Sequence, residues 1–166
     1  RFYFFEDIEM LEADFHGHSS RSSCGQCSVM EMCEAAFRKG MKGLTISDHA
    51  PGVGGAQGLA LDTALCGFST FGIRVPRYVC GVRLFKGIEA NVLDDAGAVD
   101  VPLALARRLD VVLLGVHPYT TYQPGSVTKN TDALLRAMER HPYADIISHP
   151  CQRGFAVDVR VVAPLA

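Results

Sequence analysis

Short apolar runs alternate with helical patterns along most of this chain, and this alternation constrains its fold more than any other feature. Strands fit at residues 12–15, 43–47, 82–88, 111–115 and 145–148, with helical patterns at residues 28–40, 101–108 and 132–140. Such alternation is typical of βα units around a parallel sheet. Because 166 residues is the usual size of one domain, we expect residues 1–166 to form one α/β domain or part of one.

Local signals define three of the helix boundaries. Ser28 followed by Glu31 fits a capping box at a helix start, and Gly40 is expected to end that helix. Thr131 is expected to cap the helix over residues 132–140. These positions predict where the helices between the strands begin and end.

The stretch between the second and third strands is less regular. Residues 51–58 contain four glycines and predict a loop suited to the rim of a site. A short helix is expected over residues 61–66, and Pro76 marks a boundary.

Composition excludes several classes of function. Sixteen Lys and Arg against eighteen Asp and Glu leave a net charge of −2, which disfavours electrostatic capture of nucleic acid. The apolar run at residues 111–116 is far shorter than the roughly 20 residues of a membrane span, and the N-terminus lacks the features of a signal peptide. Six irregularly spaced cysteines favour a reducing cytoplasm over a disulfide-stapled secreted fold.

Metal-capable side chains follow the predicted strands, always at the same end. In a parallel barrel the carboxyl ends of all strands open on one face, where such folds build their active sites. Only His141 falls elsewhere, at a helix end where a capping role suits it. The residues at the strand ends are His16 and His18, Asp48 and His49, Glu89, His117 and His149.

These residue types indicate a site for more than one metal ion. His16 and His18 are two positions apart, so on an extended segment their side chains project to the same side. Five histidines and Glu89 offer six nitrogen or oxygen ligands, which suit zinc, manganese or iron and are too nitrogen-rich for calcium or magnesium. A carboxylate such as Glu89 can bridge two cations, and paired cations promote hydrolytic displacement.

The cysteines allow several interpretations. Cys24 and Cys27 form a C-x-x-C, which can be a redox pair or half of a structural zinc site. Without a second such pair, or a helix starting directly after Cys24, the redox interpretation is disfavoured. Cys24 follows His18 by six residues, close enough to curl back as a thiolate ligand. Cys151, two residues after His149, fits either the rim of the site or the core.

Five motifs, taken in order, resemble those of the PHP domains, the polymerase and histidinol phosphatase superfamily. The H-x-H segment is similar to the family's first motif, and the segment from residue 128 to 150 particularly resembles the small stand-alone PHP phosphatases. The five matching segments are residues 13–19 (ADFHGHS), 46–49 (ISDH), 86–91 (KGIEAN), 115–117 (GVH) and 145–150 (DIISHP).

The resemblance implies a distorted TIM-like (β/α)7 barrel, of which this chain holds about five βα units. It also implies a hydrolase with phosphoesterase activity and a centre of three zinc, manganese or iron ions. Glu89 would bridge the closer pair of ions, and His49 would belong to the third. The other ligands of that pair would be His16, His18, His117 and His149.

Two departures from the family pattern stand out. Cys24 occupies the position where the small PHP phosphatases have a histidine, which favours softer metals. The family completes its site with a late Asp-x-His pair, and this chain ends before it, as expected of a truncated form. The unpaired barrel edges would then favour aggregation or oligomerisation.

The mechanism implied is metal-assisted hydrolysis of a small phosphorylated metabolite by an activated hydroxide. Asp14 is a candidate for proton transfer, and Asp48 is expected to orient a ligand histidine. Arg77 and Lys86 are candidates for phosphate contact, although both also fit ordinary surface charges.

Two alternatives have other signatures. An amidohydrolase would carry a metal-bridging lysine where this chain has Glu89, and this disfavours it. A degenerate PHP-like domain with a structural or metal-binding role would lack turnover, and Cys24 with the shortened barrel supports it. Metal content and turnover separate these alternatives.

Overall fold

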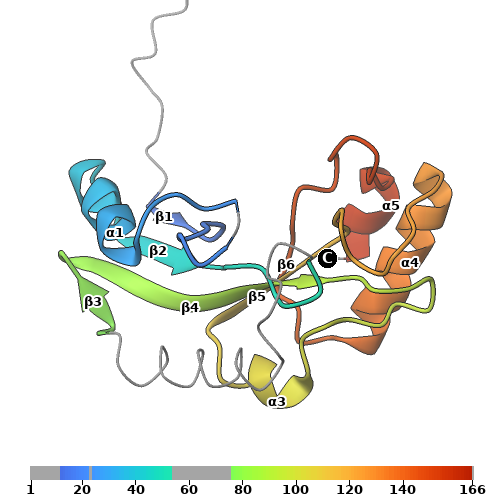
Figure 1. Cartoon of the computed structure of the whole chain (residues 1–166), viewed down its shortest axis with the longest axis horizontal. Coiled ribbons are helices and arrows are strands. Elements are labelled where there is room, and N and C mark those ends of the chain that lie inside the picture. Colours follow the sequence, from blue (N-terminus) through green and yellow to red (C-terminus); the bar gives the residue numbers. More distant parts are fainter. Residues whose placement is uncertain (1–11, 23, 54–75, 166) are drawn as a thin grey trace, which may run out of the picture.

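A sheet flanked by helices forms the framework of this protein (Figure 1). The structure, a computed structural model, describes residues 12–22, 24–53 and 76–165. Figure 1 shows α1 beside the amino-terminal strands and α4 and α5 beside the carboxyl-terminal ones. The elements are β1 (Ala13–Asp14), α1 (Val29–Arg38), β2 (Gly43–Ile46), β3 (Tyr78–Val79), β4 (Val82–Asn91), α3 (Leu103–Ala106), β5 (Val111–Gly115), α4 (Val127–Arg140), β6 (Ile146–Ile147), α5 (Val159–Val162) and a 3-10 helix (Ala163–Leu165).

The sheet has the order β1-β2-β4-β5-β6, and each neighbouring pair along this path is parallel. The first half of β4 pairs with β2, from Arg83 to Lys86, and its second half pairs with β5, from Gly87 to Asn91. Such stagger between strands is the register shift that curves a parallel sheet into a barrel. The expected fold class is confirmed: the chain is an α/β half-barrel.

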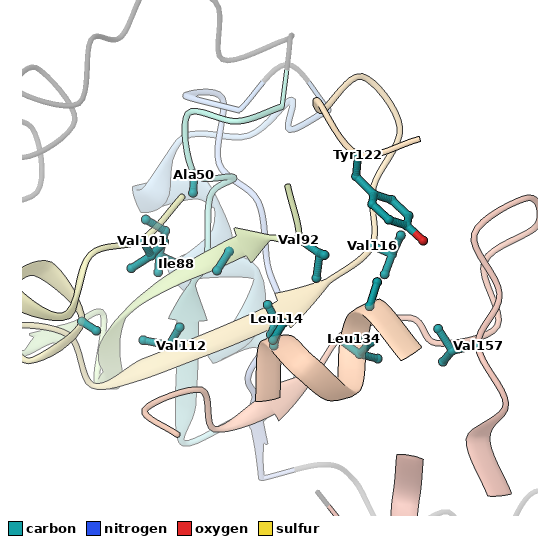
Figure 2. Packing of buried hydrophobic residues seen from close by; sticks show 14 of the residues in the cluster. Ala50, Ile88, Val92, Val101, Val112, Leu114, Val116, Tyr122, Leu134 and Val157 are labelled. Atoms are coloured by element: carbon teal, nitrogen blue, oxygen red, sulfur yellow. The ribbon is translucent and has the colours of Figure 1, made fainter. Parts of the chain in front are cut away.

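One face of the sheet carries the main hydrophobic core. Side chains alternate between the two faces of a strand, so Ile88 of β4 points toward the helices together with Val92, which directly follows β4, and Leu114 of β5. Figure 2 shows Leu114 next to Leu134 of α4 and Ile88 next to Val101 in the same cluster. A second cluster, which includes Cys33 of α1, covers the amino-terminal parts of β2 and β4.

The opposite face of β4 carries polar side chains although it is fully buried. Glu89 and Asn91 alternate with Ile88 and Ala90 and are completely buried. A buried carboxylate is costly unless it is paired or coordinates a cation. The sheet therefore holds Glu89 where partners must be supplied from neighbouring strands.

Several predicted boundaries agree with the structure. Ser28 and Glu31 form the predicted capping box at the start of α1, and Gly40 follows the end of the helix with a φ of 76°. The helix expected at residues 61–66 lies outside the described residues, as does most of the loop at residues 51–58. Of the described helices, none is long and apolar enough to cross a membrane.

The predicted cap of the helix at residues 132–140 is wrong. The helix, α4, already begins at Val127, because the Ser126 side chain accepts a hydrogen bond from the backbone of Lys129. Thr131 lies inside α4, where its hydroxyl donates to the Val127 carbonyl and accepts from the Asp158 amide. Its side chain therefore joins α4 to the segment that starts α5.

A hairpin between β3 and β4 is absent from the predicted elements. β3 pairs with β4 in antiparallel fashion, and Cys80 and Gly81 between them have φ values of 52° and 82°. Positive φ at both central residues is the mark of a two-residue hairpin turn, for which Asn-Gly is the usual sequence signal. Cys80-Gly81 lacks the asparagine of that signal, so the sequence did not predict this turn.

Candidate metal centre

The register between β2 and β4 brings His49 next to Glu89. Ile46 is paired with Lys86, and the same register continues beyond β2 to an isolated parallel bridge between His49 and Glu89. The Glu89 amide donates to the Asp48 carbonyl at 3.1 Å, and the Ala50 amide donates to the Glu89 carbonyl at 2.9 Å. This places the imidazole of His49 beside the carboxylate.

The H-x-H segment is held tightly against β2. The Ser47 amide donates to the Gly17 carbonyl at 2.8 Å, and the Gly17 amide donates to the Ser47 hydroxyl at 3.1 Å. A Cβ at Gly17 would lie 2.9 Å from a Met32 side-chain carbon and 3.1 Å from the Thr45 carbonyl oxygen. Glycine is therefore the residue that lets His16 and His18 reach Glu89.

His117 and His149 follow β5 and β6 and approach Glu89 from the other side. The Ser148 amide donates to the Leu114 carbonyl, which extends the pairing of β6 to the residue before His149. A Cβ at Gly115 would lie 2.7 Å from Cε1 of His117 and 2.3 Å from the Ser148 hydroxyl oxygen. Gly115 thus leaves the space that the His117 ring occupies.

The two oxygens of Glu89 face different histidines. Oε2 lies 3.2 Å from Nε2 of His18 and 3.1 Å from Nδ1 of His49. Around Oε1 the Nε2 atoms lie at 3.3 Å for His16, 3.0 Å for His117 and 2.8 Å for His149. Ring nitrogens also face one another, at 3.0 Å between His16 and His18 and 3.1 Å between His117 and His149.

Several of these atoms lack the hydrogen bonds that burial demands. Oε2 of Glu89, Nδ1 of His49 and Nδ1 of His18 are buried without a hydrogen-bond partner among the described residues, as is Nδ1 of His117. His49 Nδ1 is close to Oε2, yet the pair lacks the geometry of a hydrogen bond. Buried polar atoms left unpaired cost about 1–3 kcal/mol each, so a cation bound by Oε2 of Glu89 and Nδ1 of His49 fits the site well.

Electrostatics favour the metal-binding protonation states of Glu89 and His49, but not that of His16. Burial tends to raise the pKa of Glu89, but hydrogen bonds from the surrounding histidines outweigh it and hold that pKa well below its usual range. Burial lowers the pKa of His49 to about 4, although the Glu89 charge opposes it. A hydrogen bond to Glu89 raises the pKa of His16 against the effect of burial. At neutral pH the site therefore holds an ionised carboxylate beside a neutral His49.

The donor atoms gather into three groups, each able to hold one ion. Two groups share the buried Glu89, and the third contains a thiol. The groups are His16, Glu89 and His149; His49, Glu89 and His117; and His18, Cys24 and His49.

Comparison with known families decides what this arrangement is related to. The PHP domain family matches residues 14–150, which span every histidine and the glutamate of the site. The chain belongs to the PHP domain family. The resemblance of the five motifs is therefore confirmed.

Curated relatives of this PHP domain are named as probable phosphatases. The chain is 31% identical over 156 residues to one from Caldanaerobacter subterraneus, covering 94% of this chain and 58% of the relative. It is 34% identical over 152 residues to one from Syntrophotalea carbinolica, covering 92% and 60%. For one from Acetivibrio thermocellus the identity is 33% over 153 residues, again covering 92% and 60%. The chain thus spans about three fifths of the length of these relatives.

Asp14 and Asp48 lie beside the PHP site and contact its framework. Asp14 accepts a hydrogen bond from the His16 amide at 2.9 Å. Both Asp48 oxygens accept from Ser19, one from its amide at 2.7 Å and the other from its hydroxyl at 2.6 Å. The hydrogen bonds of Asp48 thus hold the loop after the H-x-H segment, rather than the ring of a ligand histidine.

Arg77 and Lys86 are placed away from the cluster. The Arg77 carbonyl accepts from the Leu84 amide, and Leu84 precedes Glu89 by about 17 Å of extended strand. Lys86 is half-buried, about 10 Å before Glu89 along β4. A role for either residue in phosphate contact stays a prediction.

The sequence analysis missed a half-buried carboxylate that links segments next to the site. Asp100 accepts from the Asn91 amide at 2.8 Å, the Asn91 side-chain amide at 2.5 Å and the Gly52 amide at 2.7 Å. It joins the end of β4 to the loop that follows His49. A lone Asp in an irregular stretch carries no spacing signal, because its partners come from distant parts of the chain.

The cysteines near the PHP site are solvent-accessible. Cys24, Cys27 and Cys151 are free and exposed. Exposure excludes core packing for Cys151, one of the two interpretations left open by the sequence. Cys24 is the one that joins a ligand group.

Proposed function

We propose that this PHP domain is a metal-dependent phosphoesterase whose ions are held around Glu89. The observation that carries the proposal is the division of histidines between the two Glu89 oxygens, which is the arrangement of a carboxylate that bridges two cations. Relatives named as probable phosphatases support the same chemistry.

The donor set favours zinc, manganese or iron. Each of the two groups that share Glu89 combines imidazole nitrogen with carboxylate oxygen, and imidazole suits zinc and other transition metals, whereas calcium and magnesium prefer oxygen. We propose that His16 and His149 hold one ion with Oε1 of Glu89, and that His49 holds the other with Oε2. His117, which lies closer to Oε1, is grouped with His49 and would complete the second set. His18 faces the same carboxylate and adds to the set.

When bound, ions at such a site lower the pKa of water and neutralise charge on phosphate oxygens. The chain positions the substrate through the shape of the site. His117 and Glu89 form its floor, with side chains 3% and 0% exposed, whereas those of His16 and His149 are 31% and 34% exposed. A small phosphorylated metabolite would approach over His16 and His149.

Proton transfer is proposed for Asp14. Its Oδ1 atom accepts from the His16 amide, which fixes the carboxylate beside a ligand at the accessible side of the site. The other oxygen, Oδ2, is the atom that would take or return a proton. The cytoplasm is the proposed compartment, because the five cysteines among the described residues are all free and four of them are exposed.

The test measures metal content and hydrolysis on the purified chain. After loading with zinc, manganese or iron, elemental analysis by plasma mass spectrometry is compared between the wild-type chain and Glu89→Gln. Glu34→Gln is the matched control, because Glu34 is an exposed glutamate on α1. We expect the wild-type chain and the control to retain metal and the Glu89 variant to lose it, in parallel with hydrolysis of p-nitrophenyl phosphate.

Two outcomes would contradict the proposal. If the folded chain retained none of these metals, the proposed metal centre would be refuted. Metal retention without hydrolysis of any phosphomonoester would favour the alternative of a metal-binding domain without turnover.

A further inference from the structure

One residue beside the metal centre combines an exposed aromatic ring with a rare backbone conformation. Tyr119 follows His117 by two residues, is 82% exposed and has a φ of 63°. A positive φ is uncommon for any residue with a Cβ and rarest for bulky ones. The ring also leaves apolar surface in water instead of burying it. Neither feature stabilises the fold, so packing does not explain this tyrosine.

The positions of the other strained residues suggest a role for Tyr119. Among the described residues other than glycine, positive φ occurs at Tyr119, Cys80 and His149. Cys80 belongs to the hairpin turn between β3 and β4, whose geometry requires it. His149 is a proposed metal ligand. Backbone strain persists only where the surroundings impose it, and it gathers at active sites, so Tyr119 is grouped with His149 rather than with the hairpin.

Sheet topology places Tyr119 at the accessible end of the site. β5 and β6 are parallel neighbours, so the residues that follow them lie side by side. The rings of His117 and His149, which come after these strands, are 4.8 Å apart between centroids. The His117 side chain is 3% exposed and that of His149 is 34% exposed. Within about 7 Å of backbone, the chain therefore runs from the buried floor at His117 out to solvent at Tyr119.

The loop that carries Tyr119 is anchored by its neighbours. The Thr120 hydroxyl donates to the His117 carbonyl at 3.3 Å and accepts from the Tyr122 amide at 3.2 Å. Tyr122 is buried, and its hydroxyl donates to the Asn130 side chain at 3.0 Å. Figure 2 shows Tyr122 among the residues of the main core. Because these contacts fix the backbone on one side of Tyr119 and join it to His117 on the other, the ring is held in place before a ligand arrives, which lowers the entropic cost of binding.

A second exposed aromatic residue lies beside a proposed ligand but is directed elsewhere. Phe15 precedes His16 and is 41% exposed. Its ring packs against that of Phe85, with 5.5 Å between centroids. Phe85 lies four residues before Glu89, about 13 Å toward the amino end of β4. Phe15 therefore packs below the metal centre, whereas Tyr119 lies at its opening.

We propose that Tyr119 determines substrate specificity by packing its ring against a planar, aromatic leaving group of the phosphomonoester. The inference rests on the proposed function and names the substrate class of the same site. A phosphate bound over the floor at His117 would leave its organic part on the side where the chain meets solvent. Aromatic pairs in offset or edge-to-face contact stabilise a complex beyond the area that they bury. An aliphatic group would gain no such contact.

Two substitutions at Tyr119 separate the ring from the backbone. Tyr119→Asn removes the ring, and asparagine tolerates a left-handed backbone, so this variant should fold at least as well as the wild-type chain. Tyr119→Phe keeps the ring. Tyr78→Asn is the matched control, because Tyr78 is also exposed, at 60%, but lies in β3. Its partner Arg83 precedes Glu89 by six residues, about 20 Å along β4.

Non-hydrolysable phosphonates test the inference through binding alone. Isothermal titration calorimetry on the zinc-loaded chain compares phenylphosphonate with methylphosphonate, which share the phosphonate group and differ in the ring. We expect the wild-type chain to prefer phenylphosphonate by about tenfold in Kd. Tyr119→Phe and Tyr78→Asn should keep this preference, and Tyr119→Asn should reduce it to about twofold or less.

Three outcomes would overturn the inference while the metal-dependent function stands. They are equal affinity of the wild-type chain for the two phosphonates, a preference that survives in Tyr119→Asn, and a preference that is lost in Tyr78→Asn or Tyr119→Phe as well. A zinc-loaded wild-type chain that bound neither phosphonate would overturn both this inference and the proposed function.

Discussion

Nδ1 of His49 lies 3.1 Å from Oε2 of Glu89, yet both atoms are buried without a hydrogen-bond partner in the described part of the chain. The backbone explains the proximity, because a parallel bridge pairs the two residues in the register of β2 and β4. The strand register does not explain why these two polar atoms lie so close without forming a hydrogen bond. A shared cation does, since each atom then keeps a lone pair directed at the ion.

Gly115→Ala should disturb the site without replacing any proposed ligand. The added Cβ would lie 2.7 Å from Cε1 of His117 and 2.3 Å from the Ser148 hydroxyl oxygen, so one of these groups must move. Overpacking of this kind costs about 1–3 kcal/mol. We expect urea denaturation to show this decrease in the free energy of unfolding, and elemental analysis to show weaker retention of zinc or manganese.

Gly125→Ala is the matched control for that substitution. Its Cβ would meet only the flexible Lys129 side chain, which can move aside. If Gly115→Ala retained metal and stability as well as Gly125→Ala does, the close fit of the His117 ring would be refuted.

Asp48→Ala should loosen the loop that carries Cys24. The substitution removes both hydrogen bonds from Ser19 to Asp48. Ser19→Ala keeps the one from the amide, and it loses the one from the hydroxyl together with the longer contact, at 3.3 Å, that the hydroxyl accepts from the Arg21 amide. We expect a loss of about 1–3 kcal/mol for Asp48→Ala and less for Ser19→Ala. In urea denaturation the double variant should be about as stable as Asp48→Ala, because Asp48→Ala already removes the hydrogen bond of the Ser19 hydroxyl to Asp48.

The alternative for Asp48, orientation of a ligand histidine, has a different outcome. In that case the double-mutant cycle of Ser19→Ala and Asp48→Ala would give a coupling energy near zero, because the effects of the two single substitutions on stability would add. Additivity in the cycle would therefore speak against the Ser19 contact as the main role of Asp48.

The sequence was sufficient to predict which residues gather in the cluster but not how they are arranged. His16, His49 and His149 were predicted to meet because each follows an apolar strand, and parallel strands end on one face. Which Glu89 oxygen each ring faces depends on the register between strands, such as the bridge from His49 to Glu89. Register arises from packing across the whole sheet, so the linear pattern does not specify it.

Contacts between distant polar residues escaped prediction for a related reason. The hydrogen bonds from Ser19 to Asp48 and from Gly52 to Asp100 join segments that only the fold brings together. Local rules also failed where two signals competed. Thr131 resembles a helix cap in sequence, but Ser126 accepts the capping hydrogen bond and extends α4 by a turn.

Metal affinity should rise with pH across the neutral range. The hydrogen bond to Glu89 raises the pKa of His16 above 6.5 in the metal-free chain, so a proton competes with the ion at His16 below neutrality. His49, with a pKa of about 4, stays neutral throughout this range. Competition with a chromogenic chelator should therefore show weaker metal binding at pH of about 6 than at about 8.

His16→Gln separates this effect from general acid sensitivity. The variant should bind metal more weakly at every pH and show a shallower dependence on pH between these values. An unchanged slope would assign the competing proton to another group.

The stability of the metal-free chain should depend on pH through His141, which lies outside the site. Burial lowers the pKa of His141, opposed in part by a hydrogen bond to the Gly97 carbonyl. Between its lowered folded pKa and the unfolded value of about 6.5, the unfolded chain binds more protons than the folded one. Stability therefore rises with pH through this window and levels off above it. Urea midpoints measured with a chelator present should fall more steeply on acidification for the wild-type chain than for His141→Gln, and identical slopes would show that His141 stays freely titratable in the fold.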